Sequence, residues 1–182
     1  LQKEQFKKHP LTSEAELIHA ITLLWELKER EYQYAALDLA IKYKKLWTAK
    51  SFDLFEKMIR TKSWWDTVDY IAPKHIGKYA QQDGAIHMLM DRWIDDDYLW
   101  IRRAAIIYQL TYKGTTDHDK LFTYCRKRMH EKEFFIQKAI GWALREYAYT
   151  DSQAVIEFIQ KEKSSLAPLS YREAGKHCLK NF

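Results

Sequence analysis

Hydrophobic residues recur at the spacing of an amphipathic helix along nearly the whole chain. Leu17, Ile21 and Leu24 mark the first clear segment, and similar spacing continues through the middle and the end of the sequence. This spacing places the apolar side chains on one face of a helix. Sustained alternation of apolar and polar residues, which would predict strands, does not occur. The pattern therefore predicts an all-α protein.

Helix boundaries are marked by capping residues and by polar breaks. Three sites are typical of helix starts, the first two as capping boxes: Ser13-x-x-Glu16, Ser170-x-x-Glu173, and Ser63 just before Trp64. Breaks fall near residues 28–30, 47–51, 81–84, 95–97, 113–116, 131–133, 151 and 164–168. These boundaries predict about nine or ten helices of roughly 10 to 17 residues, joined by short links. Because no linker separates them, residues 1–182 are expected to form a single domain.

Helices that carry a small residue in an aromatic-rich stretch recur at a fixed interval. Ala104, Ala139 and Ala174 are each 35 residues apart, and stepping back by 35 and then 34 residues reaches Asp69 and Ala35. Two helices of this combined length cannot bury their apolar faces alone, so successive pairs must stack. The Trp, Leu-Gly and Tyr pattern of tetratricopeptide repeats is missing. We therefore expect an α-solenoid of HEAT-like antiparallel helix pairs.

Asp69 interrupts this repeat, because it stands where the equivalent helices carry alanine. Trp65 precedes it by one helical turn, on the same face. The preceding Trp64 is expected to join Val68 and Ile71 in the apolar stripe, since neighbouring residues on a helix point about 100° apart. Trp65 is then left beside the carboxylate, whose burial without a partner would be costly. This surface is a candidate functional site.

The repeat register adds Trp142 and Arg103 to the same region. Trp142 lies three residues after Ala139, on the surface that carries Asp69. Arg103 is adjacent to Ala104 in the sequence and is expected at the rim of that surface. Structural explanations remain open at this point. Asp69 could cap a helix or pair with a lysine, both tryptophans could simply pack, and Arg103 could be solvent-exposed or ion-paired.

Composition narrows the classes of function. With only 5 Gly and 3 Pro, the chain lacks the turn residues of a sandwich, a barrel or a Gly-rich nucleotide-binding fold. A hydrophobic fraction of 47% excludes disorder, and the absence of a long uninterrupted apolar run argues against a membrane span. The 30 Lys and Arg residues against 25 Asp and Glu give a net charge of +5, which favours a polyanionic partner.

Other candidate chemistry is weak. Cys125 and Cys178 lack zinc-site spacing and are interpreted as free thiols in a reducing compartment, and no export signal is evident, so a cytoplasmic location is expected. Consecutive side chains at Asp95–Asp97 cannot easily converge on a metal, and Asp97 is expected to cap the following helix. The basic residues 126–128 either form a solvated helix end or reach phosphates. No metal, cofactor or hydrolase triad is expected.

Tryptophan-rich blocks give the sequence a family resemblance. The segments SWWDTVDYIAP (63–73), WIRRAAIIYQLTYK (100–113), EFFIQKAIGWALREYA (133–148) and LAPLSYREAGKH (166–177), together with LLWELKEREYQYAALDLAIKYKK (23–45), resemble AlkD-type DNA alkylation repair glycosylases. The resemblance covers nearly the whole chain. It implies a helical solenoid with a basic concave face that cradles duplex DNA. It also implies hydrolysis of the N-glycosidic bond of cationic alkylpurines such as 3-methyladenine and 7-methylguanine, with the lesion left largely stacked rather than flipped. The protein is expected to act as a monomer.

The resemblance also assigns roles to residues. It implies that Asp69 is the catalytic carboxylate, that Trp65 and Trp142 flank the sugar of the lesion, and that Arg103 braces the DNA backbone. Lys62 and Arg145 are expected to rim the same groove as further DNA-binding residues. The family extends beyond this sequence by about a helix pair or more at the N-terminus and by a short C-terminal segment. The competing hypothesis is a non-catalytic HEAT scaffold that binds DNA or a protein partner.

Overall fold

The computed structural model describes residues 10–179, and the regular secondary structure in that range is helical. Contacts divide the chain into two compact units, Leu1–Ser63 (unit 1) and Trp64–Phe182 (unit 2). Within each unit the helices pack against one another. The predicted fold class, all-α with solenoid-like packing of helices, is confirmed. The interpretation of residues 1–182 as one domain stays a prediction.

Unit 1 contains α2 (Glu14–Glu26), α3 (Arg30–Lys42), a 3-10 turn (Lys44–Leu46) and α4 (Ala49–Arg60). The capping box predicted at the start of α2 is confirmed. The Ser13 hydroxyl accepts a hydrogen bond from the backbone N–H of Glu16, and the Glu16 carboxylate accepts one from the N–H of Ser13. Capping of this kind satisfies backbone donors that a helix start leaves unpaired. The buried face of α2 then packs against α3 and α4.

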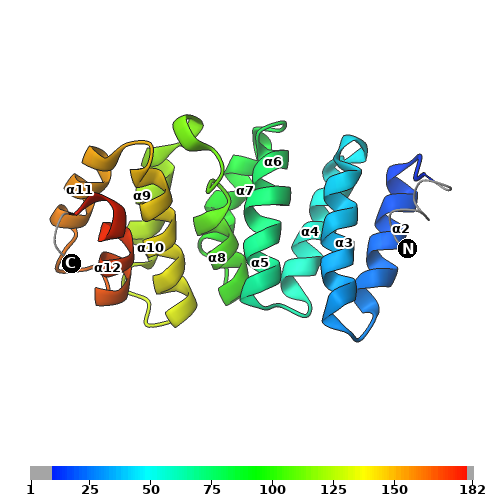
Figure 1. Cartoon of the computed structure of the whole chain (residues 1–182), viewed down its shortest axis with the longest axis horizontal. Helices are drawn as coiled ribbons and strands as arrows, with labels where there is room; N and C mark the ends of the chain where they lie inside the picture. Colours follow the sequence, from blue (N-terminus) through cyan, green and yellow to red (C-terminus); the bar gives the residue numbers. More distant parts are fainter. Residues whose placement is uncertain (1–9, 180–182) are drawn as a thin grey trace. The chain divides into compact units, whose positions relative to one another are not determined.

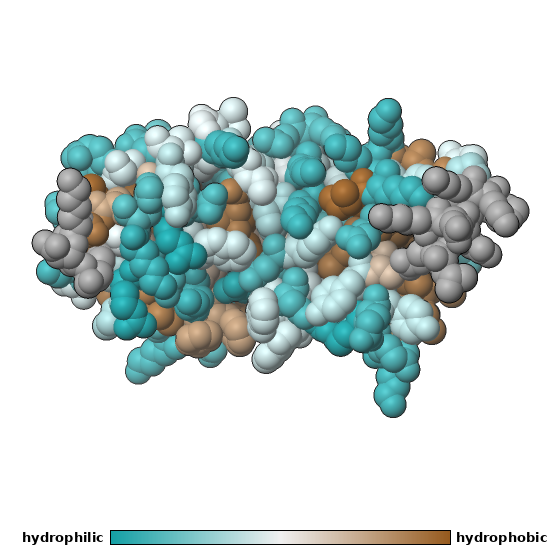
Figure 2. Space-filling view, in the orientation of Figure 1, coloured by the Kyte–Doolittle hydropathy of each residue, from teal (hydrophilic) through white to brown (hydrophobic). Residues whose placement is uncertain are grey.

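Unit 2 is built from two layers of helices. The first layer contains α5 (Trp65–Ile71), α8 (Leu99–Ile107), α10 (Phe134–Ala148) and α12 (Pro168–Cys178), which lie side by side (Figure 1). The second contains α7 (Ala85–Trp93), α9 (His118–Arg128) and α11 (Ser152–Lys161), and a 3-10 turn (Lys113–Thr115) precedes α9. Each second-layer helix packs against its neighbours in the first layer. In the same view, hydrophilic side chains cover most of the visible face of unit 2, with hydrophobic ones in separate patches (Figure 2).

The 35-residue register holds in unit 2. Ala104, Ala139 and Ala174 are fully buried and lie on α8, α10 and α12, the successive helices of the first layer. Small side chains at these points let neighbouring helices approach closely. Asp69 lies at the equivalent position of α5, the first helix of the layer. The repeat thus carries one carboxylate in a row of alanines.

A proline makes α5 short. Pro73 has no backbone N–H, so it cannot donate the usual helical hydrogen bond to the carbonyl of Asp69. The chain instead forms a wider π-type turn (Ala72–Ile76), which Gly77 closes by donating to the carbonyl of Ala72, and then continues as α6 (Gly77–Ala80). Wide turns of this type within helices are frequent at functional sites.

The expectation for Trp64 was wrong. Trp64 precedes α5 with an extended backbone, φ −152°, instead of lying inside the helix after a cap at Ser63. The 100° relation between helical neighbours therefore does not apply to it. Val68 and Ile71 are fully buried as expected, whereas Trp64 is 48% exposed and rests on the rings of Trp100 and Phe135, with centroids 5.9 and 5.5 Å away.

The capping box expected at Ser170-x-x-Glu173 is also not formed. Helix α12 begins at Pro168, because proline is well suited to the first helical position. Ser170 and Glu173 consequently lie inside the helix. The Ser170 hydroxyl donates to the carbonyl of Gln137 on α10, 2.9 Å away, and Glu173 contacts cationic side chains.

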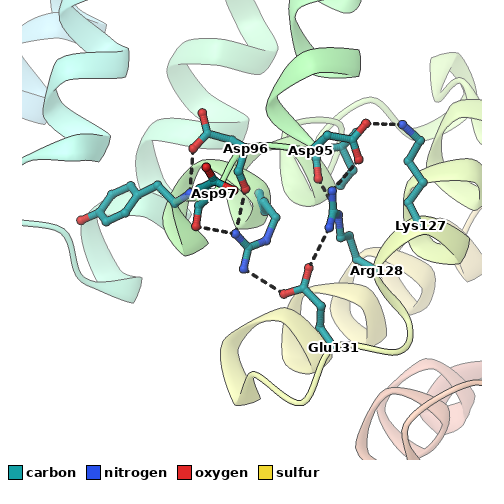
Figure 3. Close-up of polar contacts among 9 residues, drawn as sticks. Asp95, Asp96, Asp97, Lys127, Arg128 and Glu131 are labelled. Carbon is teal, nitrogen blue, oxygen red and sulfur yellow. Dashed lines mark hydrogen bonds and ion pairs between the residues drawn. The ribbon is translucent and has the colours of Figure 1, made fainter.

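The Asp95–Asp97 turn holds neighbouring helices together (Figure 3). Asp96, not Asp97 as expected, accepts the hydrogen bond from the backbone N–H of Tyr98, 2.8 Å away. The backbone carbonyls of Asp96 and Asp97 both accept from Arg102. The turn therefore has a structural function.

The basic residues at the end of α9 are engaged in ion pairs. Lys127 and Arg128 both pair with Asp95 (Figure 3). Arg126 pairs with Glu162, 2.8 Å away. Pairs of this kind across neighbouring helices fix long side chains in one geometry. The basic residues therefore connect the end of α9 to Asp95, which follows α7, and to Glu162, which follows α11, instead of forming a freely solvated helix end.

Cys125 and Cys178 are free thiols, as expected. Within residues 10–179, no group of three or more His, Cys, Asp and Glu side chains is arranged to hold a metal ion. The helices of the same residues include none with the length and apolar character needed to cross a bilayer.

Candidate active site

A cavity of about 260 Å³ opens on unit 2 between residues of α5, α8, α10 and α12. Its lining comprises Trp65, Asp69, Arg103, Phe134, Phe135, Lys138, Trp142, Arg145 and Glu173. The structure thus brings together the three residues expected to be catalytic, Asp69, Trp65 and Trp142. Two of the three expected DNA-binding residues, Arg103 and Arg145, line the same cavity.

Asp69 and Arg103 form a two-pronged ion pair. The Nε of Arg103 lies 2.7 Å from Oδ1 of Asp69, and its Nη2 lies 2.8 Å from Oδ2. The third guanidinium nitrogen, Nη1, donates to the backbone carbonyl of Phe135 on α10. The Asp69 side chain retains 15% exposure, against 5% for Arg103. Arg103 therefore holds the carboxylate on its buried side, while the exposed side of the carboxylate faces the cavity.

Two opposing effects act on the Asp69 carboxyl. Burial raises its pKa above the ordinary value of 3.8, and the hydrogen bonds and positive charge of Arg103 oppose that shift. The neighbouring carboxylate of Asp66 raises the pKa further. A partly desolvated anion of this kind interacts more strongly with a nearby positive charge than an anion in water does. The site is therefore suited to stabilise a cation that enters the cavity.

Aromatic side chains flank the carboxylate. Trp65 is the first residue of α5 and is 48% exposed, while Trp142 lies on α10 and is half-buried. Phe134 and Phe135, at the start of α10, extend the apolar wall. Ring faces carry partial negative charge, so they attract electron-poor C–H groups and cations.

The expected rim position of Arg103 was wrong. Its guanidinium lies beneath Asp69 with three donor nitrogens engaged, so the ion-paired alternative is the one found. The reason is burial, since a guanidinium that leaves water needs a carboxylate and carbonyls as partners.

Arg145 and Lys62 have local partners. Arg145 lines the cavity as expected, and its Nη1 lies 2.7 Å from a carboxylate oxygen of Glu173. Lys62 belongs to unit 1, where its ammonium donates to the carbonyls of Glu26 and Leu27, 2.9 and 2.6 Å away. These bonds satisfy carbonyls that the end of α2 leaves unpaired. The DNA-binding role of Lys62 stays a prediction.

Two residues of the cavity lining, Lys138 and Glu173, were not expected at the site. Each precedes a repeat alanine by one residue, as Arg103 does, so a comparison of that register position would have identified both. Lys138, Arg103 and Glu173 all line the cavity.

These features define an all-α protein of stacked helices with a cavity lined by charged and aromatic side chains. A family model described as DNA alkylation repair enzyme matches residues 1–178. The chain therefore belongs to the DNA alkylation repair enzyme family, whose members act on DNA. A solved structure titled predicted DNA alkylation repair enzyme from Enterococcus faecalis is 32% identical, with a TM-score of 0.89, and the match covers 98% of this chain and 83% of that one. No curated protein matches.

Proposed function

We propose that this protein is a DNA glycosylase that hydrolyses the N-glycosidic bond of cationic alkylpurines, such as 3-methyladenine and 7-methylguanine, in duplex DNA. Membership of the DNA alkylation repair family supplies the class of substrate. The observation that carries the proposal is the Asp69 carboxylate, held by both prongs of Arg103 and exposed to a cavity flanked by Trp65 and Trp142.

The leaving group of the proposed reaction needs little activation by the enzyme. An alkylated base already carries a positive charge, and it leaves as a neutral base with the electron pair of the glycosidic bond. Positive charge then develops on the deoxyribose, and the Asp69 carboxylate stabilises it electrostatically. A water adds its oxygen to the anomeric carbon, and its proton passes to Asp69 or to solvent. Arg103 keeps the carboxylate in place throughout.

The two tryptophans are proposed to bind the sugar. Their faces present partial negative charge to the C–H groups of a deoxyribose that is becoming cationic. They also exclude bulk water, which strengthens the interaction between Asp69 and the sugar. The exposure of Trp65 leaves the cavity accessible from the surface.

The form of the cavity supports catalysis without base flipping. Enzymes that flip bases enclose the extruded base in a fitted pocket. A cavity that opens to the surface beside the exposed Trp65 instead suits the sugar edge of a nucleotide that remains stacked.

Release of free base tests the proposal. The protein is incubated with duplex DNA containing a single 7-methylguanine, and the liberated base is quantified beside a matched undamaged duplex. The proposal expects time-dependent release of 7-methylguanine and no release of guanine. Binding of the damaged duplex without release of base would instead support the non-catalytic scaffold and overturn the proposal.

A further inference from the structure

Glu173 gathers three cationic side chains, of which Lys138 and Arg145 line one wall of the cavity with it. One of its carboxylate oxygens lies 3.1 Å from Nζ of Lys138 and 2.8 Å from Nζ of Lys176, and the other lies 2.7 Å from Nη1 of Arg145. The Glu173 side chain is only 7% exposed, whereas its three partners are 28–49% exposed. The anion is therefore buried beneath cations that retain contact with solvent.

Close packing of α10 and α12 creates this arrangement. A Cβ atom at Gly141 would lie 2.4 Å from the Cβ of Glu173 and 3.0 Å from the carbonyl oxygen of Ser170, so the approach requires glycine. The hydroxyl of Ser170 fixes the same contact by donating to Gln137. Lys138 and Arg145 are two helical turns apart on α10, and the close approach lets Glu173 reach both.

The charges on the two sides of the cavity differ. The Asp69 and Arg103 pair is neutral as a unit, whereas one carboxylate and three cations around Glu173 leave a net charge of +2. Burial raises the pKa of Glu173, but hydrogen bonds from Lys176 and Lys138 outweigh it and lower the pKa to about 2. Glu173 therefore remains an anion at neutral pH and continues to organise its partners.

From this geometry we infer that Lys138, Arg145 and Lys176 bind a phosphodiester of the DNA backbone, with Glu173 as the positioning residue. The cationic groups turn one donor toward Glu173 and keep others exposed to the solvent side, where a phosphate oxygen can accept them. A phosphate held on this wall places the adjoining sugar over the cavity, facing Asp69. The inference rests on the proposed function in that this phosphate adjoins the lesion.

Salt-dependent binding tests the phosphate site. Affinity for an undamaged duplex is measured across a salt titration for the wild type, Lys138→Ala and Arg145→Ala. Each substitution should weaken binding and reduce the slope of log affinity against log salt by about one. Lys161→Ala, which removes an exposed lysine of α11 outside the cavity lining, is the matched control and should leave the slope unchanged. Unchanged slopes for Lys138→Ala and Arg145→Ala would overturn the inference.

The positioning role of Glu173 predicts that binding and excision separate. Glu173→Gln removes a negative charge from the cationic cluster, so affinity for undamaged duplex should stay equal or rise. Single-turnover excision of 7-methylguanine should fall by about tenfold or more, because Lys138 and Arg145 lose their fixed geometry. Glu157→Gln, the same change on an exposed residue of α11, should alter neither quantity. Excision by Glu173→Gln at the wild-type rate would contradict the role.

Two other causes of lost excision, an unfolded variant and a wrong glycosylase proposal, can be distinguished from a wrong role of Glu173. Thermal unfolding shows whether Glu173→Gln is folded. If it is not, Glu173→Asp takes its place, with intermediate excision expected if Glu173 positions the cations and wild-type excision counting against that role. If the wild type releases no base, the glycosylase proposal fails, yet the salt slopes on undamaged duplex still decide whether the phosphate site exists.

Discussion

Arg103 binds both carboxylate oxygens of Asp69 across neighbouring helices, with nitrogen to oxygen distances of 2.7 and 2.8 Å. This two-pronged contact joins α8 to α5 at the cavity and leaves the carboxylate one exposed side. It relates fold to chemistry, because the same bond that fixes the two helices also orients the group proposed to act on the sugar.

Arg103→Lys tests that relation. Lysine keeps the charge but cannot reproduce the fork, so we expect excision to fall by about 100-fold, the scale of losing one oriented electrostatic group. In Arg103→Ala, which removes the charge, the salt slope of binding to undamaged duplex should stay at the wild-type value, because the guanidinium is buried against Asp69. A slope reduced by about one would show instead that Arg103 contacts a phosphate.

Trp64 and Trp65 form a matched pair, because they are adjacent and each is 48% exposed. Only Trp65 lines the cavity, while Trp64 packs on Trp100 and Phe135. Trp65→Ala should slow excision by about tenfold or more with a small change in stability. Trp64→Ala should lower the free energy of unfolding by about 1 kcal/mol with excision close to wild type. Single-turnover excision and chemical denaturation of both variants check this, and equal excision by the two would contradict the role of Trp65.

Gly141→Ala tests the close packing that positions Glu173. The added methyl group would meet the Cβ of Glu173 at 2.4 Å, so α10 and α12 must separate, and we expect a loss of about 1–3 kcal/mol in the free energy of unfolding. At Gly84 an added Cβ would meet no heavy atom within 4 Å, so Gly84→Ala is the control and should not destabilise the protein. Chemical denaturation measures both. Equal stability of the two variants would count against the close contact.

Glu173 should make stability depend on acid pH. Its pKa is lowered from 4.5 to about 2 in the folded protein, so it binds a proton less readily when folded than when unfolded. Its contribution to stability is therefore complete above pH 4.5 and is lost as the pH falls from 4.5 toward about 2. Denaturation curves across this range should show a shallower decline for Glu173→Gln than for the wild type. Parallel declines would contradict the assignment.

The sequence predicted the fold class and the central residues of the cavity because both follow from one periodicity. Residues that occupy equivalent positions of stacked helices lie on one surface, so the register of Ala104 and Ala139 was enough to bring Asp69 and Trp142 together. The carboxylate was identified as an exception to a repeated alanine. Its chemical role still depends on experiment.

Features that depend on how closely two helices approach each other could not be predicted from the repeat. The repeat register could have identified Lys138 and Glu173, but the contacts of Glu173 depend on Gly141, which lets α10 and α12 come close, and no local pattern encodes that distance. The starts of α5 and α12 differed from expectation because Trp64 is extended and Pro168 begins its helix earlier. Burial of Arg103 likewise became evident only from its partners.

Single-turnover excision by Asp69→Asn, measured together with its affinity for the same 7-methylguanine duplex, tests the central claim most directly. Asparagine keeps the shape of the side chain but removes its charge, so excision should fall by about 100-fold or more while binding stays equal or tightens. Asp66→Asn removes the same charge from the same helix outside the cavity lining and should excise close to wild type. Excision by Asp69→Asn at the wild-type rate, or a loss of excision explained entirely by lost binding, would contradict the catalytic role of Asp69.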